Sequence, residues 1–477
     1  MPRILILLLA LVSLPAAATE WFVAPGGSDS ASGTFAAPFK TVRHVLDMTS
    51  AGDVITLRAG TYNECDVRLR KPLTLRSYAS ERAHIHCNIT VNNSVTIQID
   101  TSASGSVLRQ LEISGGMYYG IQLQTDWYPD PCCATKSGPS NILLEDLKIH
   151  DTGRDGIKIT PKSNHVTIRN NEIWKTGAAE APGTPLDNRN ADGIDSVNVS
   201  NLVIEDNYIH DISTTGLYFK GGSSDVLVQR NRIENTGMSG ILVGFDTSVE
   251  FFDLTINPQF YESIRGTVRN NIIRNTVYEG IGLYSAKDAV VVNNTIIDTA
   301  QLGHAAIYFG VPAQDWDPIA GRPPSINPLI RNNLVQQYGG NCVEIRHWNE
   351  FGGVSGLVGN PNTDFNLFTN SNGACVFRDA RPGSPISAGG TLAQWRAYEA
   401  ADLHSIYAPA GIDTSGQLLV GSAAIDAGTT VAQVTNDLLG VARPQGLAYD
   451  VGAYEKVTVA ASPPGAAACI SLRNSGR

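Results

Sequence analysis

The sequence predicts an all-β chain folded as a parallel β-helix, in which each turn of the chain adds one rung to a column. An Ile/Val-x-x-Asn-x-Ile/Val segment recurs through the middle of the chain, at successive intervals of 36, 24, 36, 24, 40, 23 and 39 residues. About nine residues after the Asn position, most copies carry a Gly followed by an aliphatic residue. Apolar residues alternate within each copy, which is the strand period, and repeats of about two dozen residues built from short strands are typical of β-helices.

The Asn column of the repeat has a structural explanation. It comprises Asn171, Asn207, Asn231, Asn271, Asn294 and Asn333, with Leu111 and Leu147 at the same position in earlier copies. Asn tolerates the left-handed turn conformation, and stacked amides hydrogen-bond along a column. We therefore interpret this column as a ladder that supports the turns.

The two ends of the chain depart from the repeat. Residues 1–18 combine Arg3, an apolar run from Ile4 to Leu14 and a small-residue site at 16–18, which predicts a signal peptide and a secreted or periplasmic protein. Since no later apolar stretch approaches eighteen residues, we expect no membrane span.

The sequence also predicts how the column is covered and bounded. We expect the β-helix to occupy residues 19–420, with a capping helix over 38–48 followed by a strand over 54–57. Residues 421–456 resemble the C-terminal segment common in secreted bacterial β-helix proteins, which implies that they close the far end of the column. Residues 457–477 read as a disordered tail.

Charge and cysteine content limit the partners and the compartment. The formal net charge is −10 and no basic block is present, which argues against a nucleic-acid partner because phosphate contacts dominate such affinity. An acidic polymer would need a bridging cation. Of the seven cysteines, Cys65–Cys87 and Cys342–Cys375 are candidate disulfide pairs, and the odd number leaves at least one unpaired. We expect a monomer.

Three consecutive rungs carry the candidate chemistry. Asp155 precedes Gly156, Asp192 precedes Gly193 with Asp195 two residues further on, and Lys220 follows Gly216 by four. Stacking would place three carboxylates and one amine on a single exposed patch, with neighbouring rungs about 4.8 Å apart. Carboxylates this close repel one another unless a cation or a proton lies between them, and oxygen-only ligands suit Ca²⁺.

These rungs resemble those of the family 9 pectate lyases, which are secreted right-handed parallel β-helices of the pectin-lyase-like class. The N-terminal stretch Trp21-Phe-Val-Ala-Pro-Gly-Gly also resembles the opening of these families. The resemblance implies that Asp155, Asp192 and Asp195 bind calcium and that Lys220 is the catalytic base. Ala191 stands where the family has the first Asp of a pair.

The implied activity is Ca²⁺-dependent cleavage of a uronic-acid polymer such as pectate by β-elimination. Lysine has an ordinary pKa of about 10.4 and must be neutral to accept a proton, so we expect an alkaline pH optimum. Insertions at 125–139, 245–265 and 311–327 leave the column at equivalent places. They supply Trp127, Tyr128 and Phe252, whose rings are candidates for stacking on sugars. Arg154 and Lys158, beside Asp155, complete the candidate substrate-binding set.

Three other interpretations remain open. The chain could be a non-catalytic carbohydrate-binding or cell-surface protein, because a fold does not give a function. It also resembles polygalacturonases in its Asn190-Ala-Asp192-Gly-Ile-Asp195 string, but the acid–base carboxylates that such hydrolysis needs are missing from the next rungs. The weakest interpretation is a transition-metal site at His84-Ile-His86-Cys87, whose two histidines share one strand face and are expected to decorate the surface.

Overall fold

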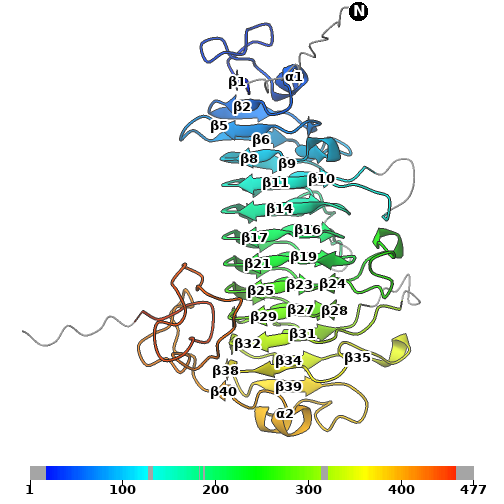
Figure 1. Ribbon diagram of the computed structural model, residues 1–477, viewed down its shortest axis with the longest axis vertical. Coiled ribbons are helices and arrows are strands. Elements are labelled where there is room, and N and C mark those ends of the chain that lie inside the picture. Colours follow the sequence, from blue (N-terminus) through cyan, green and yellow to red (C-terminus); the bar gives the residue numbers. More distant parts are fainter. Residues whose placement is uncertain (1–17, 127–132, 182, 186–188, 313–320, 458–477) are drawn as a thin grey trace, which may run out of the picture.

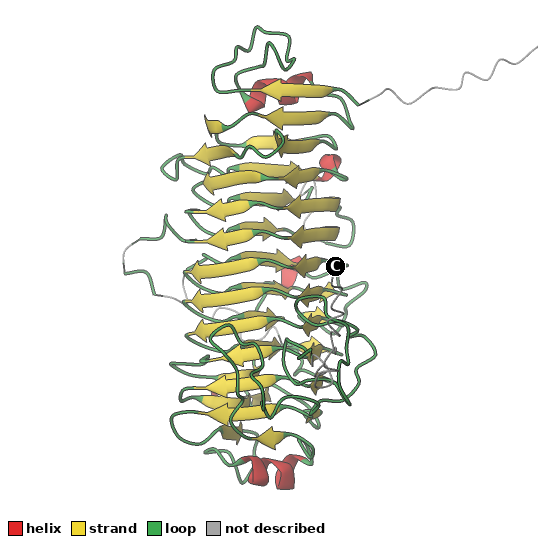
Figure 2. Ribbon diagram, turned by 90° about the vertical axis from the view of Figure 1, so that its left-hand side faces the viewer, coloured by secondary structure: helices red, strands yellow, loops and turns green. Residues whose placement is uncertain are grey.

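The computed structural model describes residues 18–126, 133–181, 183–185, 189–312 and 321–457. They form a column of stacked coils with three parallel sheets as its faces (Figure 1; Figure 2). Each coil adds one strand to each face, and the neighbouring strands within these three sheets are all parallel. The predicted parallel β-helix is confirmed. The predicted signal peptide lies outside the described residues except for Ala18, and the predicted tail except for Val457.

The strands have the following bounds, each sheet being given in spatial order from the N-terminal end. The first sheet contains β1 (Glu20–Val23), β2 (Val54–Leu57), β5 (Thr74–Ser77), β8 (Val107–Arg109), β11 (Ser140–Glu145), β14 (Asn164–Arg169), β17 (Val203–Glu205), β21 (Leu227–Gln229), β25 (Thr267–Arg269), β29 (Val290–Val292), β32 (Leu329–Arg331) and β37 (Thr363–Asp364). The second sheet contains β4 (Val67–Leu69), β7 (Ile97–Asp100), β10 (Ile121–Gln124), β13 (Ile157–Ile159), β16 (Ile194–Val197), β19 (Leu217–Lys220), β23 (Ile241–Val243), β27 (Ile281–Tyr284), β31 (Ala305–Gly310), β34 (Asn341–Ile345) and β39 (Val376–Asp379). The third sheet contains β3 (Gly60–Asn63), β6 (Ala83–Cys87), β9 (Leu111–Gly115), β12 (Lys148–His150), β15 (Glu172–Trp174), β18 (Tyr208–Ile212), β22 (Arg232–Thr236), β26 (Ile272–Thr276), β30 (Thr295–Ile297), β33 (Leu334–Gln337), β38 (Leu367–Asn370) and β40 (Ile406–Tyr407). Short strands β20 (Ser223–Ser224), β24 (Ser263–Ile264) and β28 (Ala286–Lys287) form a side sheet, and β35 (His347–Trp348) pairs with β36 (Val354–Ser355).

Alternation along each strand explains why the coils stack. In β13 the side chains of Ile157 and Ile159 are fully buried, while Lys158 between them points outward. The Gly that precedes several strands of the second sheet is required by close approach: a Cβ on Gly193 would lie 2.4 Å from the Gly216 carbonyl oxygen. The Gly-aliphatic signature therefore marks the place where one coil presses against the next.

The asparagine ladder is present and fully buried. Asn207 donates from Nδ2 to Oδ1 of Asn231 at 2.9 Å, and Asn231 does the same to Asn271 at 3.0 Å. The left-handed conformation falls on the residue before the ladder position, for example Asp206 (φ 58°), and not on the ladder Asn itself. The Asn amides therefore stabilise the column through hydrogen bonds, and the left-handed backbone conformation falls on the residue before each of them.

Replacing Asn271 by Ala is expected to destabilise the column strongly. Its amide donates to the carbonyl oxygens of Val228 and Arg269 and to Asn294, and its oxygen accepts from the backbone N–H of Asn231. Each buried polar group left unpaired costs about 1–3 kcal/mol, so a loss of several kcal/mol is expected. Urea unfolding followed by circular dichroism measures it. The exposed Asn275 (Asn275→Ala) is the control, and equal midpoints for the two variants would contradict a role for the ladder.

Helices cover both ends of the column (Figure 2). At the N-terminal end α1 (Val42–Met48), capped by Thr41, buries Val42, Val45 and Leu46 against the first coils. At the other end α2 (Leu392–Glu399) buries Trp395 against Phe377 of β39. The N-terminal capping helix predicted over 38–48 thus forms over its second half.

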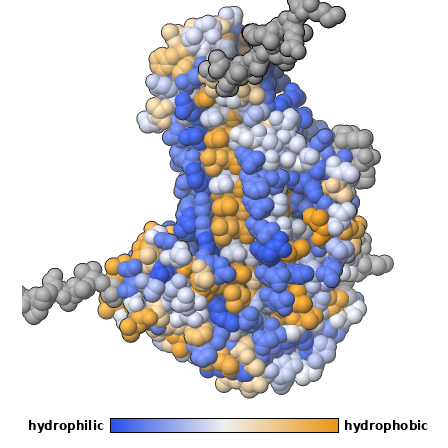
Figure 3. Space-filling model, viewed as in Figure 1, coloured by the Kyte–Doolittle hydropathy of each residue, from blue (hydrophilic) through white to orange (hydrophobic). Residues whose placement is uncertain are grey.

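The segment 421–456 does not close the end of the column, contrary to the expectation. It lies along the flank of the lower coils, where it stands out as a bulge at the side (Figure 1; Figure 3). Apolar residues of the segment cover residues of the third and first sheets: Val451 packs with Leu334, and Tyr449 with Val292. These coils carry apolar side chains on their outer surface as well as in the core. Residues 421–456 shield the outer ones from water, which the repeat itself does not do.

Two disulfides lie in the described residues, Cys65–Cys87 and Cys342–Cys375, which are the pairs that the sequence predicts. Such bonds persist in proteins that fold outside the cytoplasm. None of the described helices has the length and apolar character needed to cross a membrane.

Candidate functional site

The three predicted carboxylates converge. Asp155 and Asp192 occupy the turns that lead into β13 and β16, and Asp195 lies within β16. One carboxylate oxygen from each falls within 4.8 Å of the other two. The prediction that they lie on an exposed patch is wrong, however, because Asp155, Asp192 and Asp195 are only 0%, 5% and 1% exposed, respectively.

Aromatic and aliphatic side chains of adjacent rungs account for the burial. Asp195 is in register with Lys158 on one side and with Tyr218 on the other. Tyr119 lies near Lys158, with 6.0 Å between the centre of its ring and Nζ. Burial, followed by the charges of the cluster, raises the pKa of Tyr119 to about 12. Sequence reasoning missed both tyrosines, because the pattern does not show which outward side chains lean over a neighbour.

Hydrogen bonds satisfy only part of the carboxylate cluster. Asp155 Oδ1 accepts from the backbone N–H of Asp192 at 2.9 Å. Asp192 Oδ1 accepts from the Thr214 hydroxyl at 2.6 Å and from the Thr215 N–H at 2.9 Å. Asp155 Oδ2 and Asp195 Oδ1 are buried and have no hydrogen-bond partner. Unpartnered buried oxygens of this kind need a proton or a cation.

The electrostatics of the cluster agree with that need. Burial, together with the charges of Asp195 and Asp192, raises the pKa of Asp155 well above its ordinary value. Burial and the charge of Asp195 raise the pKa of Asp192 to about 6, against the lowering effect of the Thr214 hydrogen bond. Three oxygen donors on a rigid sheet fit a hard cation, so the group could bind a metal ion.

Lys158 lies within this cluster and not on an open surface. Its Nζ forms an ion pair and hydrogen bond with Asp195 Oδ2. Burial opposes its charge, but the carboxylates of Asp195 and Asp155 raise the pKa of Lys158 above its ordinary range. The chain therefore supplies one positive charge of its own. Arg154, by contrast, stacks its guanidinium on Tyr118 at 4.6 Å.

Lys220 lies one rung beyond the triad, at the end of β19. Its Nζ is 4.6 Å from the centre of the Tyr218 ring and 5.3 Å from that of Phe245. Among the described residues its ion pair is with Asp246, at 3.9 Å. Its positive charge also has a small lowering effect on the pKa of Asp192.

The predicted loop aromatics do not line this site within the described residues. Phe252 is only 3% exposed, and its ring packs between Phe260 and the Arg322 guanidinium, so it offers no free face to a sugar. Sequence spacing could not show that this loop packs against Arg322, which belongs to the 311–327 insertion. Trp127 and Tyr128 lie outside the described residues.

A cavity of about 360 Å³ continues the site along the same face of the second sheet. It is lined by Phe245, Asp246, Tyr284, His304, Tyr308 and Arg346, among others, and thus shares Phe245 and Asp246 with Lys220. His304 stacks on Tyr308, with ring centres 4.2 Å apart and planes 5° apart. Tyr218, Phe245 and Tyr284 continue this aromatic surface toward the triad.

A buried carboxylate organises the cavity. Glu279 accepts from the Tyr284 hydroxyl at 2.7 Å and pairs with His304 Nδ1 at 2.6 Å. Burial opposes both shifts, yet the pair lowers the pKa of Glu279 and raises that of His304. Glu279 precedes Gly280 just as Asp155 precedes Gly156, so the repeat carried a signal that sequence reasoning missed.

Comparison with known proteins agrees with this architecture. A family model described as "Right handed beta helix region" matches residues 65–184 and 138–308. The uncharacterized protein YwoF of Bacillus subtilis is 25% identical over 255 residues, 50% of this chain and 46% of its own. Pectate lyase PEL9 of Emericella nidulans is 37% identical over 71 residues, 13% of this chain and 17% of its own. The chain thus covers less than half the length of either relative.

Solved structures share the fold at low sequence identity. The structure of pectate lyase Pel9A superposes with a TM-score of 0.56 at 16% identity, covering 92% of this chain and 96% of that one. A rhamnogalacturonan lyase superposes with a TM-score of 0.50 at 16% identity, covering 68% and 84%. The likeness extends over most of the column and establishes its fold.

Proposed function

The chain belongs to the family of proteins with a right-handed β-helix region, and from that premise we propose that it is an exported polysaccharide lyase. Its substrate is an acidic, uronic-acid-containing polymer, and Ca²⁺ is its metal. The observation that carries the proposal is the convergence of Asp155, Asp192 and Asp195 within 4.8 Å of one another, with two buried oxygens left unpartnered.

Calcium at the triad would be held by these three carboxylates. When bound, it would neutralise the carboxylate of a uronate residue and favour the negative charge that develops beside it. The oxygen-only donor set supports this choice over a softer metal. The ion pair between Lys158 and Asp195 lowers the net negative charge of the carboxylate group and keeps Asp195 in place.

Lys220 is the proposed base. Its amine takes the proton from C5 of the uronate, the electrons of that C–H bond form a C4=C5 double bond, and the C4–O bond to the next sugar breaks. The departing oxygen takes a proton from water, and the hydroxide that remains takes the proton from the Lys220 ammonium, so the neutral amine is regenerated and no water is consumed. Tyr218, below the amine at 4.6 Å, and Asp246 at 3.9 Å hold Lys220 at the edge of the cluster.

The cavity around His304 supports a path for the polymer. The half-buried rings of Phe245 and His304 line the cavity and offer faces on which a sugar ring can stack, and Arg346 offers a positive charge to a uronate carboxylate. The polymer would then run along the column axis, across successive rungs of the second sheet.

The direct test is the ultraviolet absorbance of an unsaturated product. We expect polygalacturonate or another polyuronate to gain absorbance when incubated with the protein and CaCl₂, and to gain none when EDTA replaces calcium. Reducing-end assays run in parallel would detect hydrolysis, which releases sugar ends without the new C=C bond. Sugar release without absorbance would contradict elimination.

A non-catalytic carbohydrate-binding protein is the second candidate. The observation that favours it is Lys158, whose ammonium already lies among the carboxylates that calcium would need. Retention of the protein on an immobilised polyuronate, with no product absorbance across the same substrates at neutral and alkaline pH, would decide for it.

A further inference from the structure

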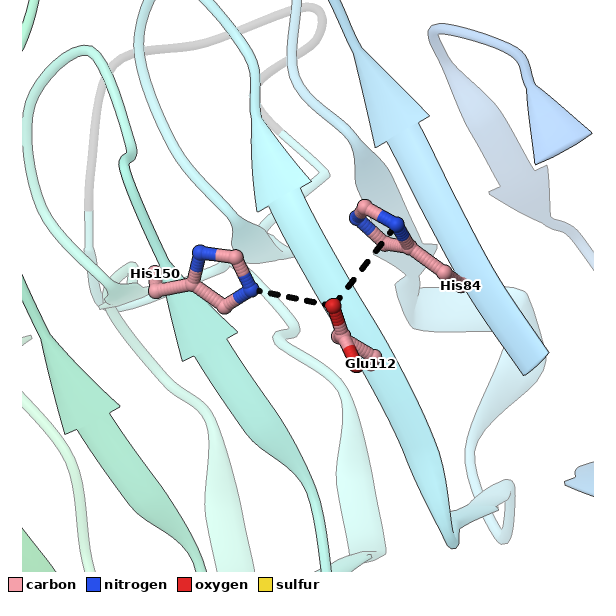
Figure 4. Close-up of side chains that lie close together, drawn as sticks. All are labelled: His84, Glu112 and His150. Atoms are coloured by element: carbon pink, nitrogen blue, oxygen red, sulfur yellow. Dashed lines mark hydrogen bonds and ion pairs between the residues drawn. The ribbon is translucent and has the colours of Figure 1, made fainter. Parts of the chain in front are cut away.

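A second group of possible metal ligands lies on the third sheet, outside the proposed active site. His84 of β6, Glu112 of β9 and His150 of β12 come from three successive rungs and turn toward one another (Figure 4). Glu112 Oε1 is 3.7 Å from His84 Nδ1 and 3.4 Å from His150 Nε2. Ligands about 2.05 Å from a tetrahedral zinc ion lie roughly 3.3 Å apart, so these separations are near those of a formed site.

The other ring nitrogen of each histidine is held from outside the group. His150 Nδ1 is 2.6 Å from Asp151 Oδ2, and His84 Nε2 is 2.7 Å from Ser114 Oγ. Histidines that bind metals almost always hydrogen-bond through their second nitrogen in this way, which fixes the ring and leaves the first nitrogen as a ligand. Trp174 stacks on His150, with ring centres 4.4 Å apart, and fixes that ring further.

A neighbouring lysine and a neighbouring cysteine are engaged elsewhere and do not compete for the site. Lys148, in register with Glu112, directs its ammonium to Glu172 at 3.5 Å. Cys87 is bound in a disulfide, so the cysteine beside the histidine pair in the sequence takes no part.

We propose that His84, Glu112 and His150 form a binding site for a divalent transition-metal ion of the zinc class. Two imidazoles and one carboxylate are the donor set that such ions prefer over Ca²⁺. Water occupies the remaining position. Because the ligands belong to three successive rungs, the bound ion links β6, β9 and β12 directly and stabilises the N-terminal coils.

The test is zinc binding to the full-length protein after EDTA treatment and buffer exchange. We expect isothermal titration with ZnCl₂ to show binding at this site, and thermal unfolding to shift upward with zinc. Co²⁺ should give the visible d–d absorption of an ion bound by nitrogen and oxygen donors. His150→Ala and Glu112→Gln should each weaken zinc binding at least about 100-fold, beyond the effect typical of losing an outer-shell partner.

A matched control is available on the same sheet. His210 has the same surroundings as His150, with Asp211 at 2.9 Å, Glu172 at 3.5 Å and 14% side-chain exposure, and it also stacks on Trp174, but the group offers no second histidine. His210→Ala should leave zinc affinity within about twofold of the wild-type value. Glu112→Gln keeps the side-chain shape, and circular dichroism verifies that each variant is folded.

Three results would overturn the proposal. Zinc affinity unchanged in both His150→Ala and Glu112→Gln would exclude these ligands, and so would an absence of zinc binding by the wild-type protein. Asp195→Asn separates this site from the carboxylate triad: it should keep the zinc signal, and its loss in that variant alone would assign the zinc to the triad. Lyase activity plays no part in the readout.

Discussion

Lys220→Ala is expected to reduce lyase turnover by about 10²–10⁴-fold, the range that a positioned general base contributes. The loss should appear in kcat, because the amine accepts a proton during the reaction and adds little to the binding of a polymer that spans several rungs. Initial rates of product absorbance at saturating polyuronate measure it, and substrate retention on a polyuronate column should persist.

The control for this prediction is Lys287→Ala. Lys287 also lies over a tyrosine ring, 5.4 Å from that of Tyr261, but on the side sheet of β20, β24 and β28. Its removal should leave kcat unchanged. If Lys220→Ala retains wild-type kcat while folded, the base is another group and the elimination mechanism proposed for this site is wrong.

The second large effect concerns the charge balance of the carboxylate triad. Asp195→Asn removes the partner of Lys158 and one of the two unpartnered oxygens. Because calcium affinity depends on the number of charged ligands, calcium binding should weaken by about 100-fold or more, and activity should fall with it. Lys158→Met should act in the opposite direction, since it deletes the internal positive charge and leaves the carboxylates dependent on calcium.

Calcium titration followed by thermal unfolding distinguishes the two variants. Without calcium, Lys158→Met should be destabilised by about 3–5 kcal/mol, the cost of removing one partner of a buried ion pair, and calcium should restore much of this loss. Asp253→Asn, which breaks the buried Lys162–Asp253 pair, is the control: it should destabilise without changing the response to calcium. An identical calcium response in all three variants would remove the triad from the metal proposal.

Most of the fold was predictable because the coils of a β-helix repeat a short local sequence pattern. A Gly followed by alternating aliphatic residues, as at Gly156, Ile157 and Ile159, recurs in several coils, and each repetition strengthens the same inference. The strand Val54–Leu57 also lies where it was expected. The position of residues 421–456 was not predictable. They pack on outward-facing side chains such as Val292, and the repeat pattern does not show what covers those side chains.

The candidate site was predictable as far as register determines it. Asp155 and Asp192 share a position relative to Gly, so their proximity followed from stacking, and Asp195 followed from strand alternation. Their burial did not follow, because it depends on which way the long side chains of Lys158 and Tyr218 lean. The His84 group was missed because its members do not share one register position: Glu112 is in register with His84, but His150 lies one rung further and two residues along the strand.

The packing of residues 421–456 along the flank also limits the order in which the molecule can fold. Asn293 Nδ2 donates to the carbonyl oxygen of Asp450, 157 positions later in the chain, and Asn270 likewise bonds Asn436. Contacts between such distant parts of a chain form slowly and late. The lower coils therefore keep an apolar flank uncovered until residues 421–456 have been synthesised and pack across it.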